Sequence, residues 1–216
     1  MQKHLEKLVD QAEVIFWDFD GVIKDSVEVK STAFEKLFSD YGQNLVDRVR
    51  RHHEKNGGVS RFEKIPLYLS WSNEVVTRKK IQEFSNRFSL LVKQSVIDSL
   101  WVCGFLKFIE CHYMTKKHVL VTATPIAEIE EILQALNIRH FFYKVYGFPN
   151  SKSDVINKTL RSLKIESKHA IMLGDSESDY KAAKDNSVLF FLRATELNKD
   201  LQSICNGWVF KDFINE

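Results

Sequence analysis

The sequence has little excess charge, few cysteines and no long apolar run. Across 216 residues the formal net charge at pH 7 is +2, so a nucleic-acid or membrane partner is not expected. No apolar stretch is long enough to span a bilayer, and residues 1–7 are charged and lack the apolar region of a signal peptide. Cys103, Cys111 and Cys205 show no C-x-x-C spacing, which favours a reducing compartment. We therefore expect a cytoplasmic protein, and the oligomeric state stays open.

The composition is that of an ordinary globular protein, with 44% hydrophobic and 28% charged residues. Apolar runs typical of strands occur at residues 13–18, 118–122, 143–146, 170–174, 188–192 and 207–210. Helical patterns lie between the later runs, at residues 127–136, 153–163 and 178–184. Strands that alternate with helices predict a layered α/β fold with a parallel sheet.

Residues 25–101 have a different pattern. They contain no clear strand, and their apolar residues, including many phenylalanines, recur at helical spacing. Such phenylalanines are more typical of core packing than of a cofactor site. Residues 56–58, Asn-Gly-Gly, predict a loop within this block. We expect a core domain formed by residues 1–24 and 102–216, and an inserted all-α domain at 25–101.

Two carboxylates follow the first apolar run. Asp18 and Asp20 are separated by one residue, and side chains at this spacing point to the same face of an extended chain. Two like charges so close favour a bound cation or a shared proton, and a divalent metal with oxygen ligands is the simplest solution. Gly21 follows, so a polar turn after the strand is the alternative interpretation.

Two later strand ends carry groups suited to an anion. Thr122, followed by Ala123, offers a hydroxyl and backbone N–H groups, although Thr122 alone is also typical of a turn. Lys152 is predicted near a helix start, where its charge opposes the helix dipole unless an anion lies nearby. Alone, it is equally compatible with a solvated surface lysine.

Another acidic residue, Asp175, follows the apolar run at residues 170–174. Asp175 follows Gly174 at the end of a buried strand, and Asp179 lies about one helical turn later. Helix capping would explain one of these acidic residues, but not why several converge with Asp18 and Asp20.

In combination, these motifs resemble the haloacid dehalogenase superfamily of phosphohydrolases. The resemblance rests on four segments in order: Asp18-x-Asp20-Gly21-Val22, Thr122, Lys152, and Gly174-Asp175-Ser176-x-x-Asp179. It extends over nearly the whole chain and implies a Rossmann-like core in which the helical insert is the family's small cap. The implied reaction is the hydrolysis of a small phosphorylated metabolite, such as a sugar phosphate.

The resemblance also implies roles for the acidic residues. Asp18 would be the nucleophile that forms an aspartyl phosphate, and Asp20 the general acid and then the general base. Magnesium would be held by the Asp18 carboxylate, the backbone carbonyl of Asp20 and Asp175. A dehalogenase is disfavoured because it needs no general acid at Asp20.

The remaining motifs would bind the phosphoryl group. The resemblance assigns its oxygens to Thr122, Ala123 and Lys152. Asp179 would position Lys152 or a metal-bound water.

The branch within the superfamily is indicated by a few residues. The segment ending in Arg61 resembles a substrate loop of β-phosphoglucomutase-like members, and Arg61 could bind a second anionic group of the substrate. A solvated loop arginine is the alternative. Mutases carry a histidine where Lys30 stands and an acidic residue where Gly174 stands, whereas Gly174 with Asp179 follows the phosphoglycolate phosphatase pattern.

Three functions are therefore compared. A magnesium-dependent phosphatase fits best, and a β-phosphoglucomutase-like phosphomutase is the alternative. A non-enzymatic binding protein on the same fold is disfavoured because no chemical residue is missing. For specificity, the cap offers His52, His53 and Arg61 as candidates.

Overall fold

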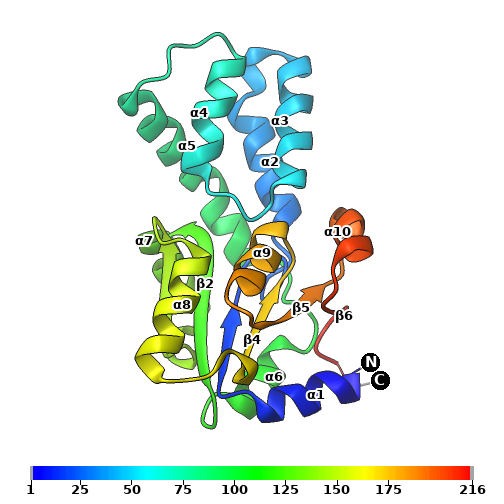
Figure 1. The fold of residues 1–216 in the computed structure, drawn as a ribbon. Helices are drawn as coiled ribbons and strands as arrows, with labels where there is room; N and C mark the ends of the chain where they lie inside the picture. The colour runs from blue at the N-terminus through cyan, green and yellow to red at the C-terminus, as the bar shows by residue number, and fades with distance from the viewer. Residues whose placement is uncertain (1, 215–216) are drawn as a thin grey trace.

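The computed structural model describes residues 2–214 of the chain. In this range a six-stranded sheet has the order β3-β2-β1-β4-β5-β6, and its neighbouring strands are parallel (Figure 1). The strands are β1 (Val14–Trp17), β2 (Lys117–Pro125), β3 (Lys144–Phe148), β4 (Ala170–Gly174), β5 (Leu189–Arg193) and β6 (Trp208–Phe210). The predicted α/β fold with a parallel sheet is confirmed.

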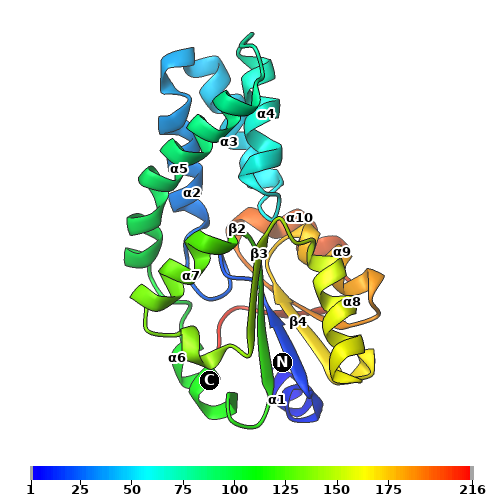
Figure 2. The same cartoon turned by 90° about the vertical axis from the view of Figure 1, so that its left-hand side faces the viewer.

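Helices cover both faces of the sheet and one end of it. The α-helices are α1 (Gln2–Gln11), α2 (Val27–Leu37), α3 (Gln43–Lys55), α4 (Arg61–Trp71), α5 (Arg78–Asp98), α6 (Phe105–His112), α7 (Ile126–Ala135), α8 (Lys152–Leu163), α9 (Glu177–Asp185) and α10 (Lys199–Ile204). Short 3-10 helices are η1 (Ser39–Tyr41), η2 (Arg139–Phe141), η3 (Ser167–His169) and η4 (Glu196–Asn198). Figure 2 shows α6 and α7 on one face of the sheet and α8 and α9 on the other.

The alternation of side chains along β1 explains this layering. All four residues of β1 are completely buried, because strands pair with it on both sides. Val14 and Phe16 pack with apolar side chains of α8 and α9. Ile15 and Trp17 point to the opposite face and pack with those of α6 and α7. A continuous apolar run is therefore what a central parallel strand requires.

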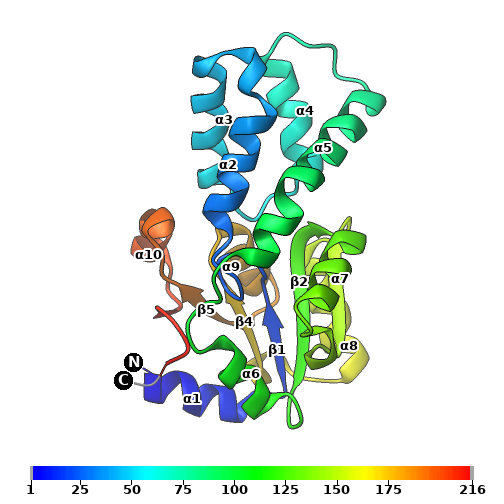
Figure 3. The same ribbon diagram turned by 180° about the vertical axis from the view of Figure 1, so that it is seen from behind.

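Helices α2 to α5 form a block above the carboxyl ends of the strands (Figures 1 and 3). Its interior is aromatic, as predicted for the phenylalanine-rich helices. The ring centroid of Phe34 lies 4.2 Å from that of Phe88, and the ring of Phe38 lies 5.4 Å from that of Phe84. Leu91 belongs to the same predicted apolar series but is 38% exposed, so the buried face of α5 is narrower than the sequence indicates. We call this block, residues 27–98, the cap.

Two chain segments join the cap to the sheet, and they lie side by side. The backbone N–H of Asp25 donates to the carbonyl of Leu100 (2.8 Å), and that of Val102 donates to the carbonyl of Ile23 (3.0 Å). Both connections therefore leave the core at one place, which is the arrangement of a hinge.

Two exclusions made from the sequence bear on the described residues. Within 2–214, every helix is too short or too polar to cross a membrane. Cys103, Cys111 and Cys205 are free thiols, as their scattered spacing predicts. The cytoplasmic location stays a prediction.

Candidate active site

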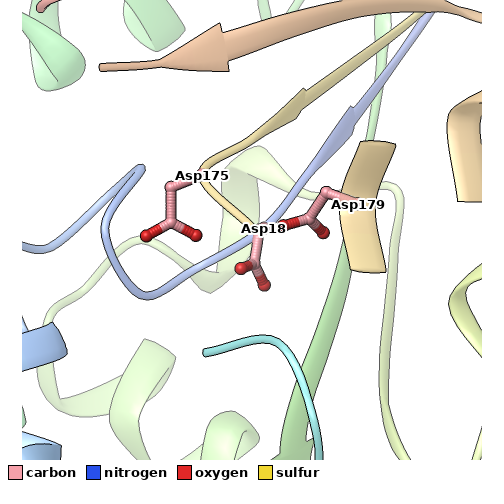
Figure 4. Close-up of side chains that lie close together, drawn as sticks. All are labelled: Asp18, Asp175 and Asp179. Atoms are coloured by element: carbon pink, nitrogen blue, oxygen red, sulfur yellow. The ribbon is translucent and has the colours of Figure 1, made fainter. Parts of the chain in front are cut away.

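Three acidic side chains gather where β1 and β4 end (Figure 4). Asp18 follows β1, Asp175 follows β4, and Asp179 lies in the first turn of α9. One carboxylate oxygen from each lies within 4.8 Å of the others. The backbone N–H of Asp18 donates to the carbonyl of Leu173 (2.9 Å), so strand pairing fixes its place relative to Asp175. The parallel sheet thus brings together carboxylates that are far apart in the sequence.

Glycine is required at two positions beside these carboxylates. Gly21 has a φ of +74°, and a Cβ there would lie 2.1 Å from Asp175 Oδ2. A Cβ at Gly174 would lie 2.3 Å from the Cβ of Asp179. An acidic residue at position 174, which the sequence analysis associates with mutases, would therefore collide with Asp179. Gly174 and Asp179 are thus physically coupled.

Lys152 supplies the positive charge of this cluster. It opens α8, whose first turn is capped by Ser151. Its Nζ lies 2.6 Å from Asp179 Oδ1 and 3.0 Å from Asp18 Oδ1. Burial alone would lower the pKa of Lys152, but Asp179 and Asp18 outweigh it and raise the pKa above its usual range. Lys152 is therefore a buried ammonium between two carboxylates.

One buried lysine does not balance three carboxylates. Burial, reinforced by Asp179, raises the pKa of Asp18 to about 7. Burial and the nearby Asp18 raise the pKa of Asp175 well above its usual range. A divalent cation would relieve this repulsion, and carboxylate oxygens are the ligands that such hard cations prefer. The donor set therefore fits a divalent metal.

Asp18 and Asp175 are the carboxylates best placed to hold that metal. Both oxygens of Asp179 already have partners, since Oδ1 accepts from Lys152 and Oδ2 accepts from the Ser176 hydroxyl (2.6 Å). Of the two roles that the resemblance implies for Asp179, these contacts favour the positioning of Lys152 over that of a metal-bound water. The backbone carbonyl of Asp20 as a further ligand stays a prediction.

The Asp20 side chain is held by the start of the cap. Ser26 Oγ donates to Asp20 Oδ1 (2.6 Å), and Lys30 Nζ forms an ion pair with Oδ2. Lys30 also donates to Thr124 Oγ1 (2.9 Å). Burial alone would raise the pKa of Asp20, but Lys30 and Ser26 outweigh it and lower the pKa below its usual value. Asp20 is therefore a carboxylate at neutral pH.

The segment around Thr122 differs in detail from its prediction. The strand expected to end at Thr122 continues to Pro125, but its pairing with β3 is interrupted between Val121 and Pro125. Thr122 Oγ1 accepts from the backbone N–H of Thr124 (3.2 Å). This irregularity takes Thr122 and Ala123 out of regular strand pairing and places them at the edge of the site.

The cap covers these groups and encloses a small cavity. From the core, the cavity is lined by Asp18, Asp20, Thr122, Ala123 and Asp175. From the cap, its charged and polar lining consists of Lys30, His53 and Arg61. Its volume is about 40 Å³, which leaves room for about three water molecules. An adjoining groove of about 490 Å³ shares Gly58 and Thr122 with the cavity and includes Lys152. A substrate therefore needs the cap to move or must enter from this groove.

Arg61 lines the cavity but is already paired. Its guanidinium makes two hydrogen bonds to Glu128 of α7, one of them Nη1 to Oε2 at 3.0 Å. Nη1 also donates to Ser89 Oγ (2.6 Å) on α5. Arg61 and Glu128 are 5% and 8% exposed. This buried ion pair joins the cap to the core.

The cap also touches the core beside the groove. Ser178 Oγ donates to the carbonyl of Gly58 (3.3 Å), and a Cβ at Gly58 would lie 1.9 Å from that hydroxyl. The ring of Phe62 stacks on Phe148, with centroids 4.8 Å apart. The cap is thus closed on the core, and glycine at position 58 permits the close approach.

The family can now be assigned. A model of the family described as haloacid dehalogenase-like hydrolase matches residues 14–192. The chain belongs to this family. Membership confirms both the family prediction and the prediction of a hydrolytic enzyme.

Relatives in the family agree with the predicted branch. The chain is 25% identical over 181 residues to a phosphoglycolate phosphatase of Vibrio cholerae, with 80% of each chain covered. It is 26% identical over 187 residues to a phosphorylated carbohydrates phosphatase of Thermotoga maritima, with 82% of each covered. A β-phosphoglucomutase structure from Clostridium difficile superposes with a TM-score of 0.74 at 17% identity, covering 94% of this chain and 92% of that one. The latter likeness shows the shared fold.

The structure brings the predicted residues Asp18, Asp20, Thr122 and Asp175 together with Arg61 of the cap at one cavity, whereas Lys30 and Glu128 were not predicted as site residues. Lys30 was noted only as a departure from the mutase pattern, although its place one turn after Ser26 could have placed it beside Asp20. No sequence motif indicated that Glu128 contacts a residue of the site. His53 lines the cavity, whereas His52 instead contacts Tyr68 within the cap.

Proposed function

We propose that the protein is a magnesium-dependent phosphatase of small phosphorylated metabolites that acts through an aspartyl-phosphate intermediate. The contact of Lys152 Nζ with Asp18 Oδ1 (3.0 Å), beside Asp175, carries this proposal. It combines a carboxylate nucleophile, a fixed cation and a second carboxylate for a divalent metal, which are the groups that phosphoryl transfer needs. Curated relatives named as phosphatases support the same reaction class.

In the first half-reaction, a carboxylate oxygen of Asp18 forms a bond to phosphorus, and the bond from phosphorus to the ester oxygen breaks. The leaving oxygen takes a proton from Asp20, the proposed general acid, and Asp20 receives that proton from the Lys30 ammonium through their ion pair. In the second half-reaction, water attacks phosphorus and gives its proton to Asp20. The bond from phosphorus to Asp18 then breaks, which releases inorganic phosphate and restores the carboxylate.

The other site residues bind and orient the phosphoryl group. Lys152 supplies positive charge, and Thr122 and the backbone N–H of Ala123 supply hydrogen bonds. Magnesium, held by Asp18 and Asp175 with the backbone carbonyl of Asp20, would neutralise charge on the transferring group. Asp179 keeps Lys152 in place through its 2.6 Å contact.

The enclosed site supports a small substrate. A cavity of about 40 Å³ does not hold a large leaving group while the cap is closed. We propose that the cap turns about the paired linkers to admit substrate and exclude water. The domain division at 25–101 stays a prediction.

A phosphomutase is the second candidate, favoured by the position of Arg61 on the cavity wall. Gly174 opposes it, since the acidic residue associated with mutases does not fit beside Asp179. A mutase returns the phosphoryl group to its organic product, whereas a phosphatase passes it to water.

Phosphate release from small phosphomonoesters, with and without magnesium, tests the proposal. We expect magnesium-dependent release that falls about a thousandfold or more in Asp18→Asn, because the nucleophile is lost. Asp40→Asn, at an exposed position of η1, is the matched control and should keep full activity. Release that persists in Asp18→Asn would contradict the proposal, and isomerised product without free phosphate would favour the mutase.

A further inference from the structure

Two cations of the cap line the cavity, and both are neutralised: Lys30 pairs with Asp20, and Arg61 pairs with Glu128. Lys64 of α4 does not line the cavity but contacts His53, which does. No carboxylate of the described residues lies within ion-pair distance of Lys64, so its charge is not balanced by an ion pair.

Lys64 is buried against a histidine. Its side chain is 2% exposed, and its Nζ lies 2.9 Å from Nδ1 of His53, which is 3% exposed. Burial, with Lys30 nearby, lowers the pKa of Lys64 to about 7. A buried amine with no counter-charge destabilises the folded protein, so apolar side chains would serve packing better.

This contact sets the tautomer of His53. When Lys64 is charged its ammonium can only donate, so Nδ1 of His53 is then the acceptor. Burial and the charge of Lys64 lower the pKa of His53 well below its usual value, so its ring is neutral. A neutral ring that accepts at Nδ1 carries its proton on Nε2. Within residues 2–214 this Nε2 has no hydrogen-bond partner, and the ring lines the cavity.

We propose that His53 and Lys64 form a subsite for an anionic oxygen group, a carboxylate or a second phosphoryl, on the organic part of the substrate. His53 contacts that group through Nε2–H. Lys64 is a positioning residue that fixes the tautomer and adds positive charge behind the ring. The subsite rests on the proposed function in that the phosphoryl group occupies the Asp18 end of the same cavity.

Matched substrates test the subsite directly. Phosphoglycolate and ethyl phosphate have the same length and differ in one carboxylate. We expect the intact protein to prefer phosphoglycolate in kcat/KM by about tenfold or more, as for a charge-assisted hydrogen bond. In Lys64→Met and His53→Leu the ratio of kcat/KM for phosphoglycolate to that for ethyl phosphate should fall to within about twofold of unity. His53→Gln keeps an N–H donor near Nε2 and should retain part of the preference.

A second pair separates the two kinds of anion. Ethylene glycol bisphosphate compared with 2-hydroxyethyl phosphate reports on a second phosphoryl group, as the first pair reports on a carboxylate. A preference in either pair that is lost in Lys64→Met supports the subsite. Equal turnover in both pairs, or a preference unchanged in both Lys64→Met and His53→Leu, overturns it.

Binding and stability keep the two proposals distinguishable. Titration with phosphonoacetate and ethylphosphonate compares the affinity for a ligand with and without a carboxylate, and it needs no turnover. If the protein hydrolyses no phosphomonoester but still binds phosphonoacetate more tightly, the subsite is supported and the proposed function fails. Lys64→Met should also raise the melting temperature, because it removes an uncompensated buried amine. A purely structural role for the pair predicts a lower melting temperature and unchanged selectivity, which would overturn the inference.

Discussion

The core side and the cap side of the cavity contribute opposite charges. The core supplies carboxylates at strand ends, and within the core Lys152 pairs with two of them. The cap supplies cations, and two ion pairs join a cap cation to a core carboxylate: the half-buried pair of Lys30 with Asp20 and the buried pair of Arg61 with Glu128. Under the proposed function, a phosphorylated substrate would compete with the protein's own carboxylates for the cations that hold the cap closed.

The two sides also differ in how their groups are fixed. Asp18 and Asp175 directly follow buried strands, so backbone pairing sets their positions. Lys30 and Arg61 lie on helices that reach the core through two linkers. The carboxylates that need a fixed geometry thus follow strands of the sheet. The cations whose ion pairs would have to break when a substrate binds lie on the cap.

The largest expected effect comes from removing the one cation that belongs to the core cluster. Lys152→Met leaves Asp18 and Asp179 without their shared partner, and we expect phosphate release to fall by about a hundredfold to a thousandfold. Lys158→Met, at an exposed position of the same helix, is the matched control. Activity within tenfold of the unchanged protein would show that charge on the core side is not essential.

A smaller effect concerns pH and the metal. The pKa of Asp18 is raised to about 7, and a metal binds only the carboxylate form, so magnesium binding must release protons below this pH. Because the pKa of Asp175 is also raised, we expect magnesium affinity to weaken by at least about tenfold for each pH unit below 7, as measured by calorimetric titration. In Asp179→Asn one repelling carboxylate is gone, so the weakening should begin at a lower pH. An affinity independent of pH between 5 and 7 would contradict the charge repulsion described for the core.

The smallest effect is expected at the cap interface. Glu128→Gln releases Arg61 from its buried carboxylate, and we expect KM for a substrate with two anionic groups to fall severalfold. Glu131→Gln, on the same helix α7 as Glu128, removes an exposed pair with Lys93 of α5 and should change KM little, since exposed pairs contribute only about 0–1 kcal/mol. If Glu128→Gln and Glu131→Gln changed KM equally, the buried pair of Arg61 would affect substrate binding no more than an exposed pair does, which would contradict this prediction.

Local pattern was enough to predict the sheet and the acidic end of the site. The apolar run of β1 could belong only to a buried element, and the carboxyl ends of parallel strands meet at one edge. The family resemblance associates Gly174 and Asp179 with phosphatases, and the 2.3 Å distance between a Cβ at position 174 and the Cβ of Asp179 gives that association a physical reason. These features depend on neighbours in the chain or on a regular sheet.

The features that escaped prediction depend on how the cap sits on the core. Arg61 and Glu128 are far apart in sequence, and nothing in the residues around either one indicates that they form an ion pair. His53 was a candidate for specificity, but its contact with Lys64 could not be predicted, because that contact depends on the burial of both side chains within the cap. The irregularity of β2 at Thr122 likewise arises from pairing with β3 rather than from composition.

The paired linkers also influence how the sheet assembles. Val14 pairs with Lys117, and the whole cap lies between them in the sequence. Contacts among cap helices are local and form early, whereas joining distant strands must overcome the entropy of closing a long loop. Once the cap has formed, the backbone N–H of Val102 lies 3.0 Å from the carbonyl of Ile23, so the loop left to close is short. Destabilising the cap should therefore slow the pairing of β1 with β2, although no cap residue belongs to either strand.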